Sequence, residues 1–591
     1  MNENYWSRQL SRRRLLRAAG GTSLGLTTLS LLGCGGEDSE EPKQQGLITN
    51  PEDTSNQAQH GGIFADHAVG DETNLDPIST IRGAGTGGIE TAGYQKLLRE
   101  KEFPGGTKSQ VFEGDAAESY ELADGGLRLI AKLRPNNRFD PRAPTNGRVL
   151  NAQDVAYSWD KMVEVNTYAS TLANKKDPAV PIESVTAIDS RTVVYKMAFP
   201  WSALLAGLAE GGPHQIAPIE AEDKFKPQTT TRGSGPWMLE YEPSVAFRWR
   251  RNPGYFLNNV PYLEGYDQPI LPEYATRLSQ FRAKGVWSLL PNPADLPATM
   301  NDLPSVLAYQ GEIGISHLHM YFSGRPDNPF RDVRLRRAAA MALDRELFAE
   351  VLSEAETLRS FGLPPTLIIN NNIPGGASDY WLEPTGKEMG SAGQYFKYDQ
   401  AEARKLISAA GHANGIDVVA RVSTRSHGAG KESDIALEMM QEVGFRVKNE
   451  PAEYNTVYVP NIISAKGDWD GNISFSGGSM GFSPATGLFR VHHPAGGTSR
   501  VSWRGEPWDS DHKKISDLID AAGKEIDQER YRSRIYELQR ELGLYQGAVI
   551  VNFSTGPFSL VWPWVKNWNT FRLARATTGF RHVWIDEKLK T

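Results

Sequence analysis

The 591-residue sequence contains one cysteine, so an internal disulfide cannot form and the fold must rest on packing. It also lacks long apolar runs. Outside the N-terminal region no stretch approaches 18 apolar residues, and even there the uncharged segment 18–32 is rich in Gly, Ser and Thr. Since a membrane-spanning helix needs about 20 predominantly apolar residues, we expect no stable span.

An excess of positive charge is missing as well. The formal net charge is -7, which gives no general attraction to phosphate backbones and argues against nucleic acid as a partner. With 39% hydrophobic and 23% charged residues, the composition is that of a globular protein. The length corresponds to three or four domain-sized units.

Signature motifs for catalysis and metal binding are absent: the sequence has no HExxH, GxSxG or P-loop. His492 and His493 are adjacent, and on a strand adjacent side chains point to opposite faces. They also lack the partners of a metal site. We therefore expect no metal, no cofactor and no catalytic residues, although catalytic groups can assemble from distant positions.

The N-terminal segment has the pattern of an export signal. SRRRLLR (11–17) resembles a twin-arginine motif, with Arg12 and Arg13, and LLGC (31–34) resembles a lipobox. The resemblance implies a signal peptide over 1–33, lipid on Cys34 and an exported, membrane-anchored protein. A buried thiol or an ordinary cleaved signal remains the alternative. The polar segment 34–60 is predicted to be a flexible tether.

Both helical and strand periodicities occur, which predicts a mixed α/β (α+β) protein. Segments 192–199 and 247–252 are typical of strands. Asn151 and Asp154 predict the start of one helix, and Asp399 and Glu402 predict the start of another.

A further helix is predicted within NPFRDVRLRRAAAMALDREL (328–347), with Asp332 as its cap. Its apolar residues recur at helical spacing, whereas Arg334, Arg336 and Arg337 fall largely on other faces. We interpret these arginines as a solvated face paired with nearby acidic residues.

Between Gly114 and Met162 the sequence contains the motifs AESY (117–120), DGGL (124–127), LRP (133–135) and AQDV (152–155). In these motifs it resembles the family 5 extracellular solute-binding proteins of ABC importers, which bind oligopeptides, dipeptides or nickel. Further motifs follow in the family's order: NLDP (74–77), SVTAIDSRTVVYKM (184–197), GSGPWMLEYEP (233–243), RNPGYF (251–256), the helix segments 328–347 and 398–415, and 517–542.

This resemblance implies a periplasmic-binding-protein-like fold of two lobes, joined by two crossing segments, with an extra domain inserted in the first lobe. We expect the first lobe at 61–94, 231–286 and 549–591. The inserted domain is expected at 95–230 and the second lobe at 287–548. The ligand would lie in the cleft between the lobes.

In peptide-binding members of the family, an aspartate four residues before a proline clamps the peptide amino terminus. The corresponding stretch is GGSMGFSP (477–484), where that position is Met480. Ser323 also stands where the family often has Asn. These departures count against a free peptide amino group as the part of the ligand that the protein holds. Our candidate ligand-binding residues are Asp66, His67, Tyr321, Ser323, Ser476, Met480, Phe482 and Trp503.

The resemblance implies a monomeric binding protein that captures a peptide or another small solute and delivers it to an ABC permease with its ATPase. An oligosaccharide or other organic solute is the alternative ligand. A lipid-anchored extracellular hydrolase, and a sensory or chaperone-like binder, are the alternative functions.

Overall fold

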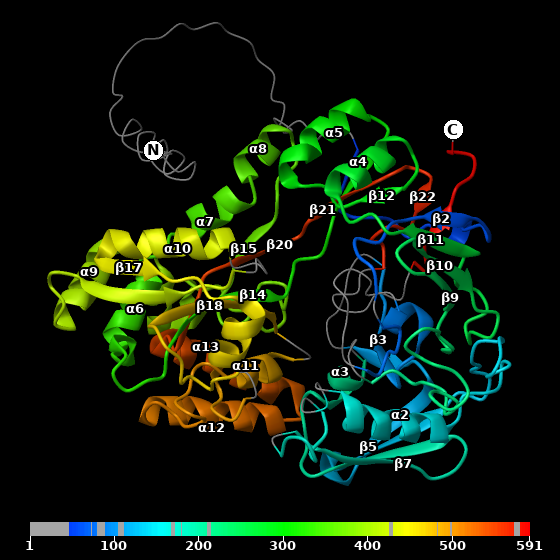
Figure 1. The fold of residues 1–591 in the computed structure, drawn as a ribbon, viewed down its shortest axis with the longest axis horizontal. Coiled ribbons are helices and arrows are strands. Elements are labelled where there is room, and N and C mark those ends of the chain that lie inside the picture. The colour runs from blue at the N-terminus through cyan, green and yellow to red at the C-terminus, as the bar shows by residue number, and fades with distance from the viewer. Residues whose placement is uncertain are drawn as a thin grey trace, which may run out of the picture.

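The computed structural model describes residues 46–72, 74–79, 89–104, 111–166, 169, 172–178, 180–209, 214–424, 430–480, 483–496, 499–571 and 580–590. Two bodies of mixed helix and sheet lie side by side, and an additional unit lies below the first of them in Figure 1. The predicted export motif (Arg12, Arg13) and Cys34 lie outside the described residues.

The first lobe is built on a four-stranded sheet of order β2-β11-β10-β9. Its strands are β2 (Ile63–Ala65), β11 (Gly265–Pro269), β10 (Ala246–Arg251) and β9 (Trp237–Glu242). In β10 the alternation predicted from the sequence is seen directly, because Phe247 and Trp249 are buried while Arg248 and Arg250 lie on the other face. Trp249 stacks on Tyr266 of β11 with ring centroids 5.6 Å apart. Aromatic burial thus holds this sheet on the lobe's core.

A second sheet in this lobe has the order β1-β13-β21-β12. It consists of β1 (Leu47–Ile48), β13 (Leu307–Gln310), β21 (Phe558–Val561) and β12 (Ser288–Leu289), and nearby lie α4 (Tyr274–Arg282), α5 (Leu296–Asp302) and the pair β22 (Val565–Lys566) and β23 (Trp584–Ile585). Residues 46–60 were expected within a tether, but β1 pairs with β13 and the Thr54 hydroxyl donates to Asn567 Oδ1 at 2.7 Å. This part of the chain is therefore packed on the lobe.

The inserted unit contains an antiparallel sheet of order β5-β6-β8-β7, covered by α2 (Ala152–Val165). The remaining elements are β5 (Ala117–Ala123), β6 (Arg128–Leu133), β7 (Ile182–Ala187), β8 (Thr192–Met197), α3 (Leu204–Ala209) and the pair β3 (Leu98–Glu100) and β4 (Phe112–Gly114). As predicted, Asn151 caps α2, and the Asp154 side chain accepts in return from the Asn151 amide at 2.9 Å.

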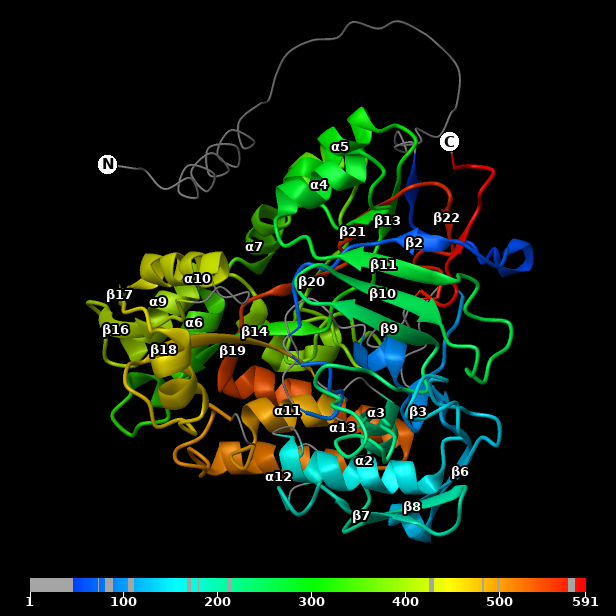
Figure 2. The same ribbon diagram turned by 45° about the vertical axis from the view of Figure 1, so that its right-hand side comes forward.

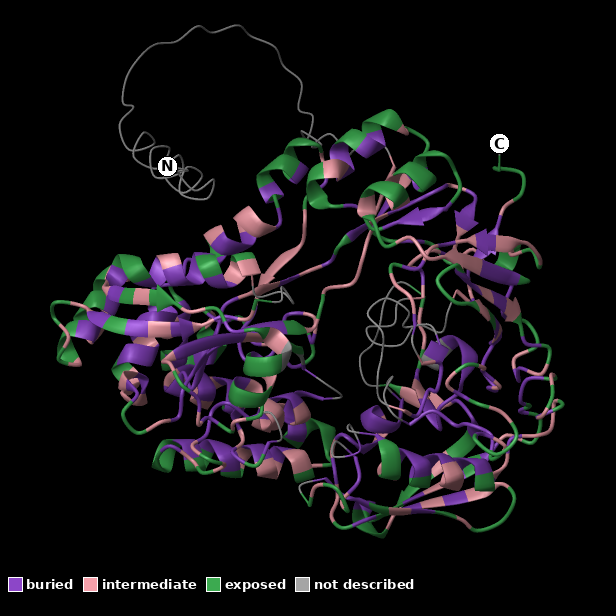
Figure 3. Cartoon of the chain, viewed as in Figure 1, coloured by how far each residue is buried: buried purple, intermediate pink, exposed green. Residues whose placement is uncertain are grey.

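The second lobe contains a mixed five-stranded sheet of order β17-β16-β18-β14-β19. The strands are β14 (Ser316–Phe322), β16 (Ile416–Arg421), β17 (Phe445–Asn449), β18 (Ile473–Ser479) and β19 (Ala548–Ile550). The helices of this lobe are α6 (Val333–Met341), α7 (Arg345–Leu352), α9 (Gln400–Ala409), α10 (Gly430–Val443), α11 (Pro484–His492), α12 (Ser510–Lys524) and α13 (Gln528–Tyr545). Figure 3 shows buried strands at its centre and exposed outer faces on α10 and α12.

Helix α6 confirms the predicted cap, because Asp332 accepts from the Arg334 amide at 2.9 Å. The predicted solvated arginine face is wrong at Arg336, whose side chain is buried. Its guanidinium donates to the carbonyls of Phe330 at 2.8 Å and Tyr545 at 3.2 Å. Main-chain carbonyls from α13 and from the segment before α6 thus replace water around this charge.

Two antiparallel segments carry the chain between the lobes. The Gly311 amide donates to the Pro557 carbonyl at 2.7 Å, and the Gly314 amide donates to the Thr555 carbonyl at 3.2 Å. A Cβ atom on Gly556 would lie 2.3 Å from the Gly311 carbonyl oxygen, so glycine permits this close approach. Because β12 and β13 belong to the first lobe's sheet, the predicted lobe boundary at 287 is wrong and the chain crosses after 310. The return crossing follows β19 (Ala548–Ile550), whereas the predicted boundary at 549 falls within that strand.

A third connection was not predicted. After α7, helix α8 (Ala355–Ser360) and the following turn bury Leu358 and Leu363 in the core of the first lobe. The chain then returns through β15 (Leu367–Ile369), which pairs with β20 (Phe553–Thr555). Figures 1 and 2 show this excursion above the crossing segments.

The inserted unit also touches the second lobe on the side away from the crossings. The Ser202 amide donates to the Gly523 carbonyl at 2.9 Å, and Lys524 Nζ lies 5.6 Å from the centre of the Phe199 ring. Both partners in the second lobe lie at the end of α12. In Figure 1 this contact closes the molecule at the bottom.

Among the described helices, none combines the length and apolarity needed to cross a membrane.

A buried ion pair joins the C-terminal region to the start of the inserted unit. Arg581 and Glu102 form this pair with side chains 2% and 8% exposed, and His582 Nε2 lies 2.6 Å from the same carboxylate. Arg581 also donates to the Tyr255 hydroxyl at 2.9 Å. Although burial opposes ionisation, Arg581 and His582 hold the pKa of the Glu102 carboxyl below its ordinary value.

We expect Glu102→Gln to lower the free energy of unfolding by about 3–5 kcal/mol, because it leaves the Arg581 guanidinium buried without a countercharge. Urea unfolding followed by tryptophan fluorescence would measure this. Glu242→Gln is the matched control, since Glu242 pairs with Arg248 on the exposed face of the same lobe and solvent screens that pair. Equal effects of the two substitutions would contradict the assignment.

Candidate ligand-binding site

A cavity of about 350 Å³ lies in the second lobe, next to the crossing segments. One wall comes from β14, whose residues His317, His319 and Tyr321 line the cavity. Successive side chains on a strand alternate between faces, so Leu318 and Met320 point into the lobe's core instead. The Met480 amide donates to the Ile315 carbonyl at 3.3 Å, which ties the cavity to the first crossing segment.

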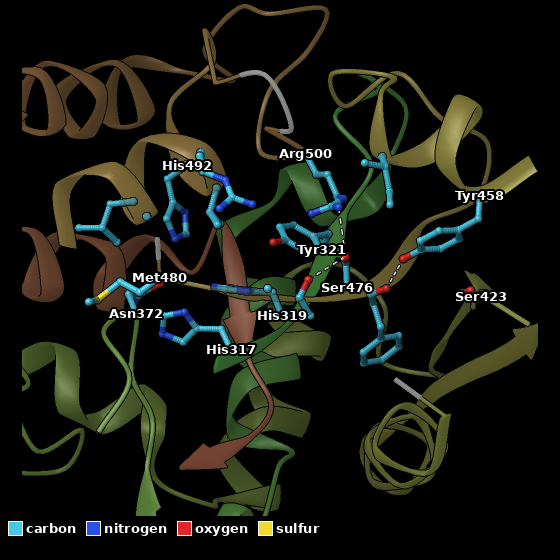
Figure 4. Close-up of a pocket in the computed structure, with 18 of the residues that line it drawn as sticks. His317, His319, Tyr321, Asn372, Ser423, Tyr458, Ser476, Met480, His492 and Arg500 are labelled. Atoms are coloured by element: carbon cyan, nitrogen blue, oxygen red, sulfur yellow. Dashed lines mark hydrogen bonds between the residues drawn. The ribbon is translucent and has the colours of Figure 1, made fainter. Parts of the chain in front are cut away.

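The remaining walls come from β18, α11, the π-helix Tyr454–Ile463 and four loop segments. Their lining residues are Asn372, Ser423, Tyr454, Tyr458, Ile463, Phe475, Ser476, Gly477, Gly478, Met480, Gly487, Leu488, Arg490, Val491, His492 and Arg500. Figure 4 shows Arg500, Tyr321 and Ser476 close together, with His317, Asn372 and Met480 grouped at the other side. A Cβ on Gly487 would lie 2.3 Å from the Met480 carbonyl oxygen, so glycine lets α11 pack against this segment.

Arg500 brings a buried positive charge to the cavity, at 7% exposure. Its Nη2 donates to the Ser476 hydroxyl at 3.1 Å, and its guanidinium lies 4.6 Å from the centre of the Tyr321 ring. Burial raises the pKa of Tyr321, which keeps the phenol neutral, although Arg500 opposes the shift. Among the described residues, no carboxylate lies within 4.0 Å of Arg500 or Arg490.

Three buried histidines form the side of the cavity between β14 and α11. Ring centroids are 5.0 Å apart for His317 and His319, and 6.2 Å apart for His319 and His492. Burial lowers the pKa of His317 and of His492 to about 3, and lowers that of His319 well below its ordinary value. The three imidazoles are therefore neutral at physiological pH.

Several buried polar atoms of this wall lack hydrogen-bond partners. These are His317 Nε2, Asn372 Oδ1, Arg500 Nε and both ring nitrogens of His492. Buried polar groups nearly always have partners, because an unsatisfied one costs about 1–3 kcal/mol. The cavity can thus satisfy both donors and acceptors of a polar molecule.

Within the described residues, no group of three or more His, Cys, Asp or Glu is arranged to hold a metal ion. His492 ends helix α11 and His493 follows it, so the alternation of side chains along a strand does not apply to this pair.

Three of the candidate residues, Tyr321, Ser476 and Met480, line the cavity together. Ser323 lies beyond the end of β14, where its hydroxyl donates to the Trp469 carbonyl at 2.8 Å. Trp503 is half-buried and exchanges main-chain hydrogen bonds with Glu506. Neither residue is among those that line the cavity. Phe482 lies outside the described residues.

Asp66 and His67 follow β2 in the first lobe and do not line this cavity. Asp66 accepts from Ser288 Oγ at 2.8 Å and from Gln268 Nε2 at 2.9 Å, which gives it a structural role between strands. Burial lowers the pKa of His67, and the nearby Asp66 opposes that shift.

The sequence patterns did not indicate six of the lining residues, namely His317, His319, His492, Asn372, Tyr458 and Arg500. One signal was available: His317, His319 and Tyr321 recur with period two in SHLHMYF, as residues on one face of a strand do. Arg500 lies in an irregular segment, where periodicity carries no signal.

The model of the bacterial extracellular solute-binding proteins, family 5, matches residues 111–498. The chain belongs to this family. The resemblance found in the motifs is thus confirmed at the level of the family.

The family 5 chain is 26% identical over 366 residues to heme-binding protein A of Haemophilus influenzae, a match that covers 58% of this chain. It spans 61% of that relative's length, less than two thirds. The structure of HbpA2 from Haemophilus parasuis superimposes with a TM-score of 0.71 at 18% identity, covering 89% of this chain and all of that one.

A second solved structure is that of DppA from Helicobacter pylori, a periplasmic binding protein determined in complex with the peptide STSA. It gives a TM-score of 0.66 at 18% identity and covers 90% of the family 5 chain and 99% of its own. At this identity the two structures establish the fold, which confirms the predicted two-lobed architecture.

The neutral histidines predict a stability that depends on pH. Because their pKa values lie below those of an unfolded chain, the unfolded state binds protons first as the pH falls below about 6.5. The free energy of unfolding should then fall by roughly one kcal/mol per pH unit for each histidine.

We therefore expect His492→Gln to flatten this slope between pH 6 and pH 4, as measured by urea unfolding at fixed ionic strength. His60→Gln, which replaces an exposed histidine of the first lobe, should leave the slope unchanged. A slope that is the same in wild type and His492→Gln would show that this ring is already protonated in the folded protein.

Proposed function

We propose that this family 5 protein captures a small polar solute outside the cytoplasmic membrane and delivers it to an ABC permease with its ATPase subunits. The observation that carries the proposal is the cavity beside the crossing segments, lined by Arg500, neutral histidines and tyrosines. A volume of about 350 Å³ falls at the lower end of the range for small-molecule sites. The relatives include proteins whose names state heme or peptides as ligands.

The crossing segments support a mechanism in which the lobes close on the solute. A few residues joining two packed bodies can absorb the rotation of hinge closure. A solute that contacts both lobes binds the closed form better than the open form, and its differential affinity shifts the population towards closure. The permease would then recognise the closed form.

For this mechanism we assign the units by the observed strands. The first lobe comprises 46–94, 231–310 and 557–590, with the inserted domain at 95–230. The second lobe comprises 316–551, apart from the excursion that places α8 on the first lobe. Residues 34–45 of the predicted tether lie outside the described residues, and we propose that the protein acts as a monomer.

Membership of the family points to a binding protein rather than an enzyme. The cavity's contacts agree with that reading, since the Ser476 hydroxyl accepts from Arg500 and, among the described residues, is not paired with a histidine that could act as its base. A lipid-anchored hydrolase remains the alternative that the following measurement separates.

A thermal-shift screen over peptides, sugars, organic acids and nickel should find a ligand class that raises the melting temperature. Binding to the folded state alone stabilises it by about 2.7 kcal/mol when the ligand is at 100 times its Kd. Mass spectrometry after incubation should recover every ligand intact. New products would establish a hydrolase, and no shift with any class would contradict solute capture.

We also propose that Cys34 carries the lipid that holds the protein at the membrane, after export through the segment containing Arg12 and Arg13. One acyl chain binds a membrane only marginally, so multiple acylation would be required. Cys34→Ala should move the protein from the membrane fraction to the soluble extracytoplasmic fraction and leave solute affinity unchanged. Continued membrane retention of this variant would contradict the anchor.

A further inference from the structure

We propose that the cavity selects a small organic anion, whose carboxylate or phosphate group is held by Arg500 together with Ser476 and Tyr321. This inference rests on the proposed function of solute capture and specifies the chemical class of the solute. It also assigns ligand-contacting roles to Arg500, Arg490 and His492, which the sequence motifs did not indicate.

The charge of the lining favours an anion. Among the described residues that line the cavity are Arg490 and Arg500, and none of them is Asp or Glu. A guanidinium removed from water without a countercharge loses several kcal/mol of solvation, which an anionic ligand restores through charge-assisted hydrogen bonds. The lining histidines are neutral, so the positive charge of the wall comes from Arg490 and Arg500.

Other buried arginines of this protein donate mainly to a carboxylate or to several main-chain carbonyls. Arg581 is paired with the Glu102 carboxylate. Arg336 and Arg345 each donate to three main-chain carbonyls, although Arg345 Nη2 has no partner. Arg500 instead donates to the Ser476 hydroxyl and lies against Tyr321, while its Nε has no partner. Its Nε donor is therefore available for a bidentate contact, the geometry that guanidinium groups form with carboxylate and phosphate.

The unpartnered polar atoms on the other side of the cavity indicate what the rest of the ligand contains. His317 Nε2, Asn372 Oδ1 and the nitrogens of His492 have no partners, and Figure 4 shows His317 and Asn372 on the far side of His319 from Arg500. A solute with an anionic group at one end and hydroxyl or amide groups at the other would satisfy both ends. Such a molecule matches the polar atoms of the cavity better than a purely apolar acid.

The same lining disfavours a free ammonium group. Met480 is buried in this wall at 2% exposure and offers a thioether where a cation would need a carboxylate. A buried ammonium near Arg500 and Arg490 would also meet like charges. We therefore infer discrimination against solutes whose only charge is a free amine.

The test uses the purified full-length protein and matched pairs of probes in isothermal titration calorimetry. Each pair differs in one group: a sugar acid and its neutral parent sugar, an N-acetylated peptide acid and its amide, and a sugar phosphate and the same sugar. We expect the anionic member of at least one pair to bind about 100-fold more tightly. The carboxylate and phosphate arms show which anion the site takes.

Arg500→Gln should weaken binding of that anionic probe by about 100-fold. Arg500→Lys should retain part of the affinity, because it keeps the positive charge but loses the planar guanidinium that makes two parallel hydrogen bonds. Arg504→Gln is the matched control. It removes the same charge four residues away, from an exposed side chain that pairs with Asp468 outside the cavity. This control should stay within about two-fold of wild type.

The empty proteins distinguish a ligand-binding arginine from a structural one. Removing a buried charge that has no countercharge should leave the melting temperature of Arg500→Gln equal to or higher than that of wild type. A lower melting temperature with unchanged probe affinity would overturn the inference. Neutral probes that bind as tightly as their anionic partners would overturn it while leaving solute capture intact, and no binding by any probe would contradict both.

Discussion

The close approach of two crossing segments is the constraint on which the two-lobed structure depends. Gly311 and Gly556 lie so close that neither tolerates a Cβ without displacing the opposite main chain. The hydrogen bonds of Gly311 and Gly314 hold this short ladder together, and β14 and β19 begin and end the second lobe's part of the chain beside it. The cavity adjoins this ladder, because His317 follows the first crossing by two residues. The wall that would hold a solute thus begins directly beside the connection between the lobes.

Buried positive charge is managed in three different ways across the molecule. A carboxylate neutralises Arg581, main-chain carbonyls solvate Arg336, and a hydroxyl with an aromatic ring receives Arg500. The first two arrangements are complete within the protein and belong to its stability. The third leaves the Nε donor of Arg500 without a partner inside a cavity. This is the arrangement expected where affinity for a ligand takes precedence over stability.

Features decided within a few residues could be predicted from the sequence. The cap of α2 at Asn151, the cap of α6 at Asp332 and the alternation in β10 depend on local spacing, and the collinear motifs led to the family and its architecture. Features that depend on distant partners could not be predicted. Arg336 is buried because a carbonyl from residue 545 reaches it, and no local pattern encodes that contact.

The candidate site also combines residues that local motifs indicate with residues that only the fold brings together. His317 and His492 come from segments 175 residues apart, and only the fold brings their rings to one wall. Tyr321, Ser476 and Met480 were found because they lie near motifs of the family, whereas Arg500 lies in an irregular segment. The lobe boundary at 287 failed for a related reason: nothing in the composition of residues 288–310 distinguishes a strand of one lobe from a strand of the other.

The two lobes are joined at the crossing segments. On the opposite side of the molecule the inserted unit contacts the second lobe through Ser202 and the end of α12, so the connection between the two sides forms a ring. One such hydrogen bond contributes about 1 kcal/mol and an exposed cation–π contact about 0.5–1 kcal/mol. Their sum of about 1.5–2 kcal/mol corresponds to roughly 10 to 30 molecules with the contact formed for each one without it. A modest thermal fluctuation would thus be enough to break the contact between Ser202 and the end of α12. A solute that contacts both sides could lengthen many-fold the lifetime of the state with this contact formed.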